Sequence, residues 1–174
     1  AQTAMEAALT GHMVFTTLHA NDTATAITRL NEMGIPPYLV GSSVVGVMAQ
    51  RLIRKICPKC SSTRSVDSEK DKIAHDHGIE FLKKAKVLDL SVEENKNVCT
   101  ICNGTGYKGR LGLYEVMKVN DNIRELIMKS STADVIRANA SENGVKSLLE
   151  YGLDLVKQGL TTIEEVERVC LLND

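Results

Sequence analysis

The sequence is poor in aromatic residues and has no excess of either charge. It contains no tryptophan, aromatic residues make up 3% of the 174 positions, and the formal net charge is −1. Few aromatic rings leave few surfaces on which nucleic-acid bases can stack, and a nearly neutral chain has no general attraction for phosphate. These two absences argue against a nucleic-acid partner, and we expect none.

Long apolar runs are also missing. No stretch approaches the roughly 18 to 20 consecutive apolar residues that a membrane-spanning helix needs. Residues 1–6 lack the basic and apolar regions of a secretory signal. Hydrophobic residues make up 43% of the chain and charged residues 25%, which is the balance of an ordinary globular domain. We therefore expect a folded chain without a membrane-spanning helix.

Four of the five cysteines form two pairs, Cys57 with Cys60 and Cys99 with Cys102, and each pair encloses two residues. A turn of this kind presents both sulfurs on one side, at the spacing that a tetrahedral metal ion requires. Two such turns complete a shell of four sulfurs. Because these thiolates would fill every coordination position, we predict a closed, structural zinc site.

Other interpretations of the cysteines fit less well. A disulfide framework is unexpected in a chain without a secretory signal. A dithiol redox centre needs one such pair in a thioredoxin-like setting, and this sequence has two pairs without that setting. Iron stays open, because four sulfur ligands alone do not separate it from zinc. The fifth cysteine, Cys170, recurs with apolar neighbours at helical spacing and is expected in the core.

The hydrophobic pattern predicts a chain dominated by helices, with two short strands. Asn21 or Asp22 is the expected N-cap of the second helix. Expected helices cover residues 3–10, 21–34, 38–53, 120–129, 132–142, 146–158 and 162–171, expected strands cover 13–18 and 110–117, and 66–98 is expected to form a peripheral helical insert.

A single buried strand at 13–18 cannot form a sheet by itself. Partner strands are therefore expected outside this sequence, and the absence of an initiator methionine before Ala1 fits the same interpretation. We expect the C-terminal end of a larger α/β protein.

Several motifs occur in a characteristic order. The segment 10–22 reads TGHMVFTTLHAND, both cysteine pairs follow it, and GYKGRLGLYEV at 106–116 and QGLTTIEEV at 158–166 complete the series. Together they resemble the secretion and pilus ATPases, the hexameric motors of type II secretion and type IV pilus assembly. The four-cysteine motif resembles the assembly and secretion branch, because retraction motors generally lack it. The resemblance covers almost the whole chain apart from the insert at 66–98.

The resemblance implies an α/β fold in three consecutive segments. Residues 1–53 would be the C-terminal portion of a RecA-like ATPase domain that carries the histidine box. Residues 54–110 would form the four-cysteine zinc module with its insert. Residues 111–174 would form a small C-terminal helical bundle.

The same resemblance implies a motor that uses ATP and Mg²⁺ in its full-length form. His12 and His19 would sense the γ-phosphate, although from the residues alone both could simply satisfy backbone groups of the fold. The parent would be a homohexamer in the cytoplasm, peripheral to the inner membrane. Its partners would be an inner-membrane platform protein and a cytoplasmic adaptor.

The phosphate-binding motif of that family, G-x-x-x-x-G-K-[ST], is absent from this sequence. The nearest spacing, Gly41 to Gly46, is followed by Val47 and Met48. Without the backbone amides and the lysine that hold the β- and γ-phosphates, hydrolysis lacks its electrostatic basis. The chain alone is therefore expected to be inactive.

Two other classes of function stay open at this stage. The chain could be a free-standing zinc-binding interaction module, although such modules are usually more basic. It could also be a redox protein with iron in the four-sulfur site. Four basic residues beside the first cysteine pair are interpreted as a solvated face or as a contact with a neighbouring subunit or an acidic partner: Arg51, Arg54, Lys55 and Lys59.

Overall fold

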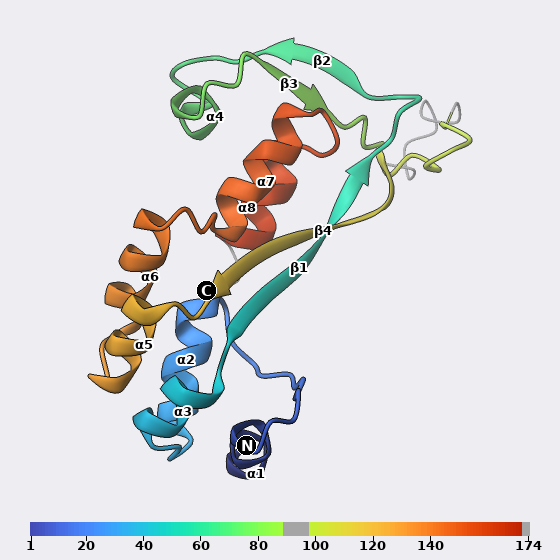
Figure 1. Ribbon diagram of the computed structural model, residues 1–174. Coiled ribbons are helices and arrows are strands. Elements are labelled where there is room, and N and C mark those ends of the chain that lie inside the picture. The colour runs from blue at the N-terminus through green and yellow to red at the C-terminus, as the bar shows by residue number, and fades with distance from the viewer. Residues whose placement is uncertain (89–97, 172–174) are drawn as a thin grey trace. The chain divides into compact units, whose positions relative to one another are not determined.

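The computed structural model describes residues 1–88 and 98–171 (Figure 1). Its contacts divide the chain into two compact units. Unit 1 comprises Ala1–Gln50 and Tyr114–Ser147, and unit 2 comprises Arg51–Leu113 and Leu148–Asp174. Two long strands, β1 (Gly46–Ile56) and β4 (Tyr107–Lys118), pair with each other, and each runs along the chain from one unit into the other. Among the described residues, no helix has both the length and the apolar character that crossing a bilayer requires.

Unit 1 is built mainly from helices. These are α1 (Gln2–Leu9), α2 (Thr23–Glu32), α3 (Pro37–Ser43), α5 (Asp121–Met128) and α6 (Ala133–Glu142). Their apolar faces and the end of β4 bury one cluster, whose larger members are Met5, Ile27, Leu30, Ile35, Leu39, Val40, Met117, Ile123, Ile127 and Ile136. The helices predicted at 3–10, 21–34, 120–129 and 132–142 are confirmed.

Side-chain caps fix two of these helix starts. The Asp22 carboxylate accepts a hydrogen bond from the Thr25 N–H at 2.6 Å, and the Asn120 side chain accepts one from the Ile123 N–H at 2.9 Å. Each cap satisfies a backbone donor that has no partner within the helix.

Two predicted elements of this region are wrong. Residues 13–18 form no strand, and Met13 and Phe15 are 74% and 91% exposed. A strand needs a neighbour for its backbone groups, and the described part of the chain places none beside this segment. The helix predicted over 38–53 ends at Ser43, and from Gly46 the chain continues as β1, in which exposed and more buried residues alternate.

Unit 2 combines an antiparallel pair of short strands with three helices among its described residues. Strands β2 (Ser62–Ser65) and β3 (Phe81–Lys84) pair antiparallel, with Ser62 opposite Lys84 and Ser65 opposite Phe81. Between them lies the short helix α4 (Lys72–Asp76), and near the end of the chain are α7 (Leu148–Lys157) and α8 (Ile163–Cys170). The helices predicted at 146–158 and 162–171 are confirmed.

The structure refines two expectations about the second half of the chain. The insert at 66–98 was expected to be helical; its described part holds the short helix α4 and also the strand β3, and residues 89–97 lie outside the described residues. The four helices expected as one C-terminal bundle divide between the units, because α5 and α6 belong to unit 1 whereas α7 and α8 belong to unit 2.

Helices α7 and α8 approach closely at Gly152. A Cβ atom at this position would lie 2.6 Å from Cγ1 of Val166, which is closer than carbon atoms can approach. We predict that Gly152→Ala lowers the free energy of unfolding by about 1 to 3 kcal/mol, because overpacking outweighs the roughly 0.5 to 1 kcal/mol that alanine gains within a helix.

Chemical denaturation of the chain checks this prediction. The double variant Gly152→Ala with Val166→Ala removes the atom that the new methyl group meets, so it should be less destabilised than the sum of the two single changes. Additive effects, or a stabilising Gly152→Ala, would contradict the packing argument.

Candidate metal centre and histidine segment

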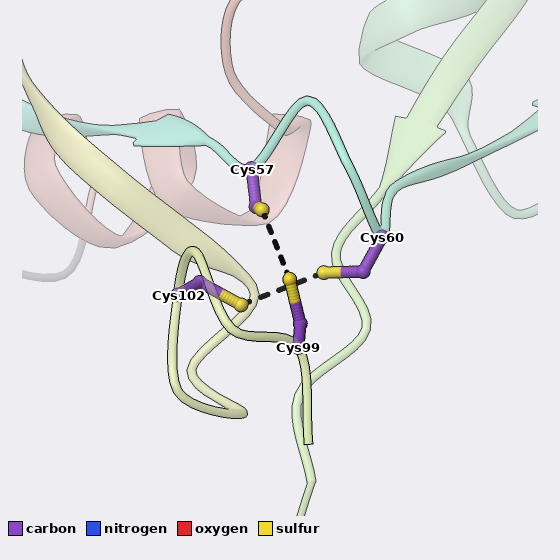
Figure 2. Close-up of side chains that lie close together, drawn as sticks. All are labelled: Cys57, Cys60, Cys99 and Cys102. Carbon is purple, nitrogen blue, oxygen red and sulfur yellow. Dashed lines mark hydrogen bonds between the residues drawn. The ribbon is translucent and has the colours of Figure 1, made fainter. Parts of the chain in front are cut away.

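The four predicted metal ligands converge in unit 2. Cys57 and Cys60 directly follow β1, and Cys99 and Cys102 lie in the loop before β4; their sulfur atoms point toward one another (Figure 2). The Sγ atoms of Cys57 and Cys99 are 3.8 Å apart, those of Cys60 and Cys102 are 3.5 Å apart, and all four lie within 4.8 Å of one another. Cys57 and Cys102 are buried, and the other two are half-buried.

These distances fit a tetrahedral metal site. With metal–sulfur bonds of about 2.3 Å, neighbouring sulfurs of a regular tetrahedron lie about 3.8 Å apart. A disulfide would require about 2.05 Å, and all four cysteines are free thiols. The donor set and its spacing therefore fit zinc, and iron in the same shell is not distinguished by geometry.

Four sulfurs gathered in one place cannot all ionise without a cation. Burial, with hydrogen bonding to the other thiols, raises the pKa of Cys60 to about 12. The backbone N–H groups of Cys102 and Ile101 lower the pKa of Cys99 to about 6, because they donate to its thiolate. Burial also opposes ionisation of Cys102, but the Gly106 N–H and the Cys60 thiol outweigh it and lower the pKa. The loop thus supplies part of the charge compensation that a bound metal ion would complete.

The backbone around the cluster holds the two turns together. The Cys57 N–H donates to the Gly106 carbonyl at 2.9 Å, and the Leu88 N–H donates to the Gly104 carbonyl at 2.8 Å. Gly106 has a φ of +76°, and a Cβ atom there would meet the Lys86 carbonyl oxygen at 3.2 Å. The second turn therefore needs glycine at this position both for its left-handed backbone and for its close approach to Ala85 and Lys86.

A buried carboxylate beside this module was not predicted from the sequence. Glu165 of α8 accepts hydrogen bonds from the Arg54 backbone N–H, from the Arg54 guanidinium at 2.6 and 3.0 Å, and from the Arg168 guanidinium at 2.8 and 2.9 Å. The Arg54 guanidinium also lies 4.1 Å from the centre of the Tyr107 ring. Burial opposes ionisation of Glu165, but these donors outweigh it and lower its pKa to about 2. Arg54 was expected on a solvated face or in contact with a subunit or acidic partner, and the structure pairs it with Glu165 of the same chain.

The two histidines of the predicted phosphate-sensing site lie in an exposed part of unit 1. Nδ1 of His12 is 3.1 Å from the Thr10 hydroxyl oxygen, and its backbone N–H donates to the Ala7 carbonyl. His19 is exposed and lies just before Asp22, the N-cap of α2. Their role in phosphate sensing stays a prediction. Cys170, expected in the core, is half-buried, and burial raises the pKa of its thiol.

Comparisons with known proteins agree on one family. A model of the type II/IV secretion system protein family matches residues 1–168. The type IV pilus assembly ATPase PilB of Thermus thermophilus is 41% identical over 166 residues, which cover 95% of this chain and 18% of that protein. The type II secretion system ATPase E of Vibrio cholerae is 40% identical over 169 residues, which cover 97% of this chain and 32% of that protein.

A comparison of this structure with solved structures identifies the fold that the chain shares with them. The crystal structure of the pilus retraction motor PilT with bound ADP matches with a TM-score of 0.59 and 22% sequence identity, over 97% of this chain and 35% of that chain. The match shows that the chain shares an α/β fold with that motor. The chain spans only about a fifth to a third of the length of the curated relatives. The family match covers nearly every residue, and the chain therefore belongs to the type II/IV secretion system protein family.

Proposed function

We propose that the chain is the C-terminal region of a hexameric ATP-driven motor for type IV pilus assembly or type II protein secretion. The observation that carries this proposal is the family match over residues 1–168 in a chain whose four cysteines also converge at metal-site distances. Relatives named for pilus assembly and for secretion are 41% and 40% identical, so the proposal covers both pathways.

In this proposal, Cys57, Cys60, Cys99 and Cys102 hold a structural zinc ion. When bound, the ion supplies two positive charges to the shared thiolates and ties the end of β1 to the loop before β4. Four sulfur ligands leave no open position for substrate, so the site braces the fold and takes no part in hydrolysis.

ATP and Mg²⁺ would bind mainly to parts of the motor outside this sequence, because this chain lacks the phosphate-binding motif. His12 and His19 would face the γ-phosphate, since a histidine can donate a hydrogen bond to a phosphate oxygen. The motor would work as a homohexamer at the cytoplasmic face of the inner membrane. There it would engage a membrane-embedded platform protein and a cytoplasmic adaptor.

Steady-state ATP hydrolysis tests this proposal. We predict that a full-length protein containing this sequence hydrolyses ATP in the presence of Mg²⁺, whereas the present chain alone shows no turnover above the buffer. A full-length protein that assembles into a folded hexamer and yet hydrolyses no ATP would refute the motor assignment. Turnover by the present chain alone would refute the proposal that ATP hydrolysis needs parts of the motor outside this sequence.

A further inference from the structure

The start of helix α2 is anchored to strand β4 by a buried carboxylate. Glu115 is 7% exposed and Thr23 is 1% exposed. Oε1 of Glu115 accepts hydrogen bonds from the Thr23 backbone N–H at 2.9 Å and from the Thr23 hydroxyl at 2.5 Å. The N–H of the first residue of a helix has no acceptor within the helix, so Glu115 satisfies a donor that would otherwise be buried without a partner.

The neighbouring residue is anchored to helix α6. Oδ2 of Asp22 accepts hydrogen bonds from Nη2 and Nε of Arg137 at 2.6 and 3.1 Å, while its Oδ1 caps α2 through the Thr25 N–H. These donors outweigh the effect of burial and lower the pKa of Asp22, so its carboxylate stays charged at neutral pH. Two consecutive residues are thus tied to two different elements of unit 1.

The segment that precedes these anchors is mostly exposed, although Leu18 is partly buried and packs against the apolar cluster of unit 1. Residues 13–20 form no helix or strand, and Met13, Phe15 and His19 are exposed. Three residues of fully extended chain span at most about 11 Å, so His19 lies within that distance of Asp22, which its bonds to Arg137 hold against α6. The position of His19 therefore depends on the packing of Leu18 on one side and on how firmly residues 22 and 23 are held on the other.

We propose that Glu115 and Arg137 are positioning residues for the histidine segment: they hold Asp22 and Thr23, and through them they place His19. The inference rests on the proposed function, in which His19 faces the γ-phosphate. In this proposal both residues act through Asp22 and Thr23 and not by contact with the nucleotide.

Hydrogen exchange in the present chain tests the anchor without any activity. Glu115→Ala removes the acceptor of the Thr23 N–H, so exchange at this amide should rise at least tenfold. Exchange at amides within α5 should stay unchanged in this variant. The control is Glu125→Gln, which removes an exposed ion pair with Lys129 and should leave exchange unchanged throughout the chain. Unchanged exchange at Thr23, or an equal rise throughout unit 1, would overturn the anchor.

Kinetics of the full-length hexamer test the positioning role. Glu115→Ala, Thr23→Val and Arg137→Lys should each lower kcat at least tenfold per folded hexamer, with the KM for ATP changed less than threefold. Glu115→Gln should recover part of this loss because it keeps an acceptor oxygen. Misplacing a contact group by about 1 Å can cost about a hundredfold in rate, so a tenfold loss requires only a small shift of His19.

The outcomes separate this inference from the proposed function. An inactive wild-type hexamer would refute the proposed function, and the exchange experiment would still decide the anchor. In another outcome, the wild type is active and the variants form fewer hexamers, each with the wild-type turnover. This result would show that the two residues have a purely structural role, and it would overturn the positioning inference. A tenfold loss in the control Glu125→Gln would also overturn it.

Discussion

Replacing Cys57 with serine is expected to abolish the binding of one zinc ion per chain and to lower the thermal midpoint by roughly 10 °C or more. Four sulfurs within 4.8 Å of one another form the shell, and serine at one corner supplies no soft thiolate. Structural zinc contributes its binding free energy to folding, so the loss of a ligand destabilises the segments that the ion joins. Elemental analysis of the purified chain and a thermal melt measure the two effects.

Two controls separate metal loss from simple misfolding. Cys170→Ser changes the fifth cysteine, which lies outside the cluster, and should keep one zinc ion per chain. Cys60→Ser changes a half-buried ligand and should behave like Cys57→Ser even if the buried Cys57 position tolerates serine poorly. A strong chelator should lower the melting temperature of the wild type to that of the ligand variants and leave the variants unchanged.

A folded wild-type chain that binds no metal would contradict the zinc assignment. Iron in the same shell would colour the protein, because thiolate-bound iron absorbs visible light, so a visible spectrum distinguishes the two metals. Zinc that persists in Cys57→Ser at full stoichiometry would contradict the predicted need for all four thiolates.

The cysteine cluster is the part of the structure that the sequence predicted best, because its signal is local. The spacing of two residues within each cysteine pair already orients both sulfurs of that pair. The pairing of β1 with β4 then brings the two pairs together, because one follows β1 and the other precedes β4. Helix positions were also predicted well where caps and apolar spacing agree, as at Asp22 for α2 and at Thr162 for α8.

The β1 region was predicted wrongly because its residues satisfy two periodicities. Val44, Val47, Met48 and Leu52 recur at helical spacing, and the same region alternates in exposure when it is extended. Pairing with β4, far along the chain, decides between the two states, and no local residue signals that partner. The segment 13–18 was predicted as a strand from its composition, and it forms none. Among the described residues, no strand lies beside it to pair with its backbone groups.

The buried carboxylates could not be predicted for a similar reason. Glu115 is bound to Thr23, and Glu165 is bound to Arg54, so each partner lies far away in the sequence. A glutamate in a strand or in the first turn of a helix is most often exposed, and only the folded chain shows that these two are enclosed.

Glu165→Ala is expected to lower the free energy of unfolding by about 3 kcal/mol. The Glu165 side chain has no exposed area, and its two oxygens accept five hydrogen bonds from Arg54 and Arg168. Its removal leaves the Arg54 backbone N–H without this acceptor and two guanidinium groups without a counter-charge. Both arginine side chains are about half exposed and can reach water, which keeps the loss at the lower end of the range for broken buried pairs.

Denaturation at neutral pH measures this loss, and Glu164→Ala is the matched control. Glu164 is the exposed neighbour in the same first turn of α8, so its removal should cost less than about 1 kcal/mol. Equal effects at the two positions would show that the buried network contributes nothing beyond the charge at the helix start.

The pH dependence of stability supplies an independent test of the same network. The pKa of Glu165 is about 2 in the folded chain against 4.5 for an unperturbed glutamate, so unfolding is linked to proton uptake. The stabilisation, about 3 kcal/mol, is fully present above pH 4.5 and is lost as the pH falls toward 2. Glu165→Gln cannot take up this proton, so the stability gap between wild type and variant should be constant from pH 5 to 7 and narrow steadily between pH 4.5 and 2. A gap that stays constant down to pH 2 would mean that the carboxylate is not held in its charged form by Arg54 and Arg168.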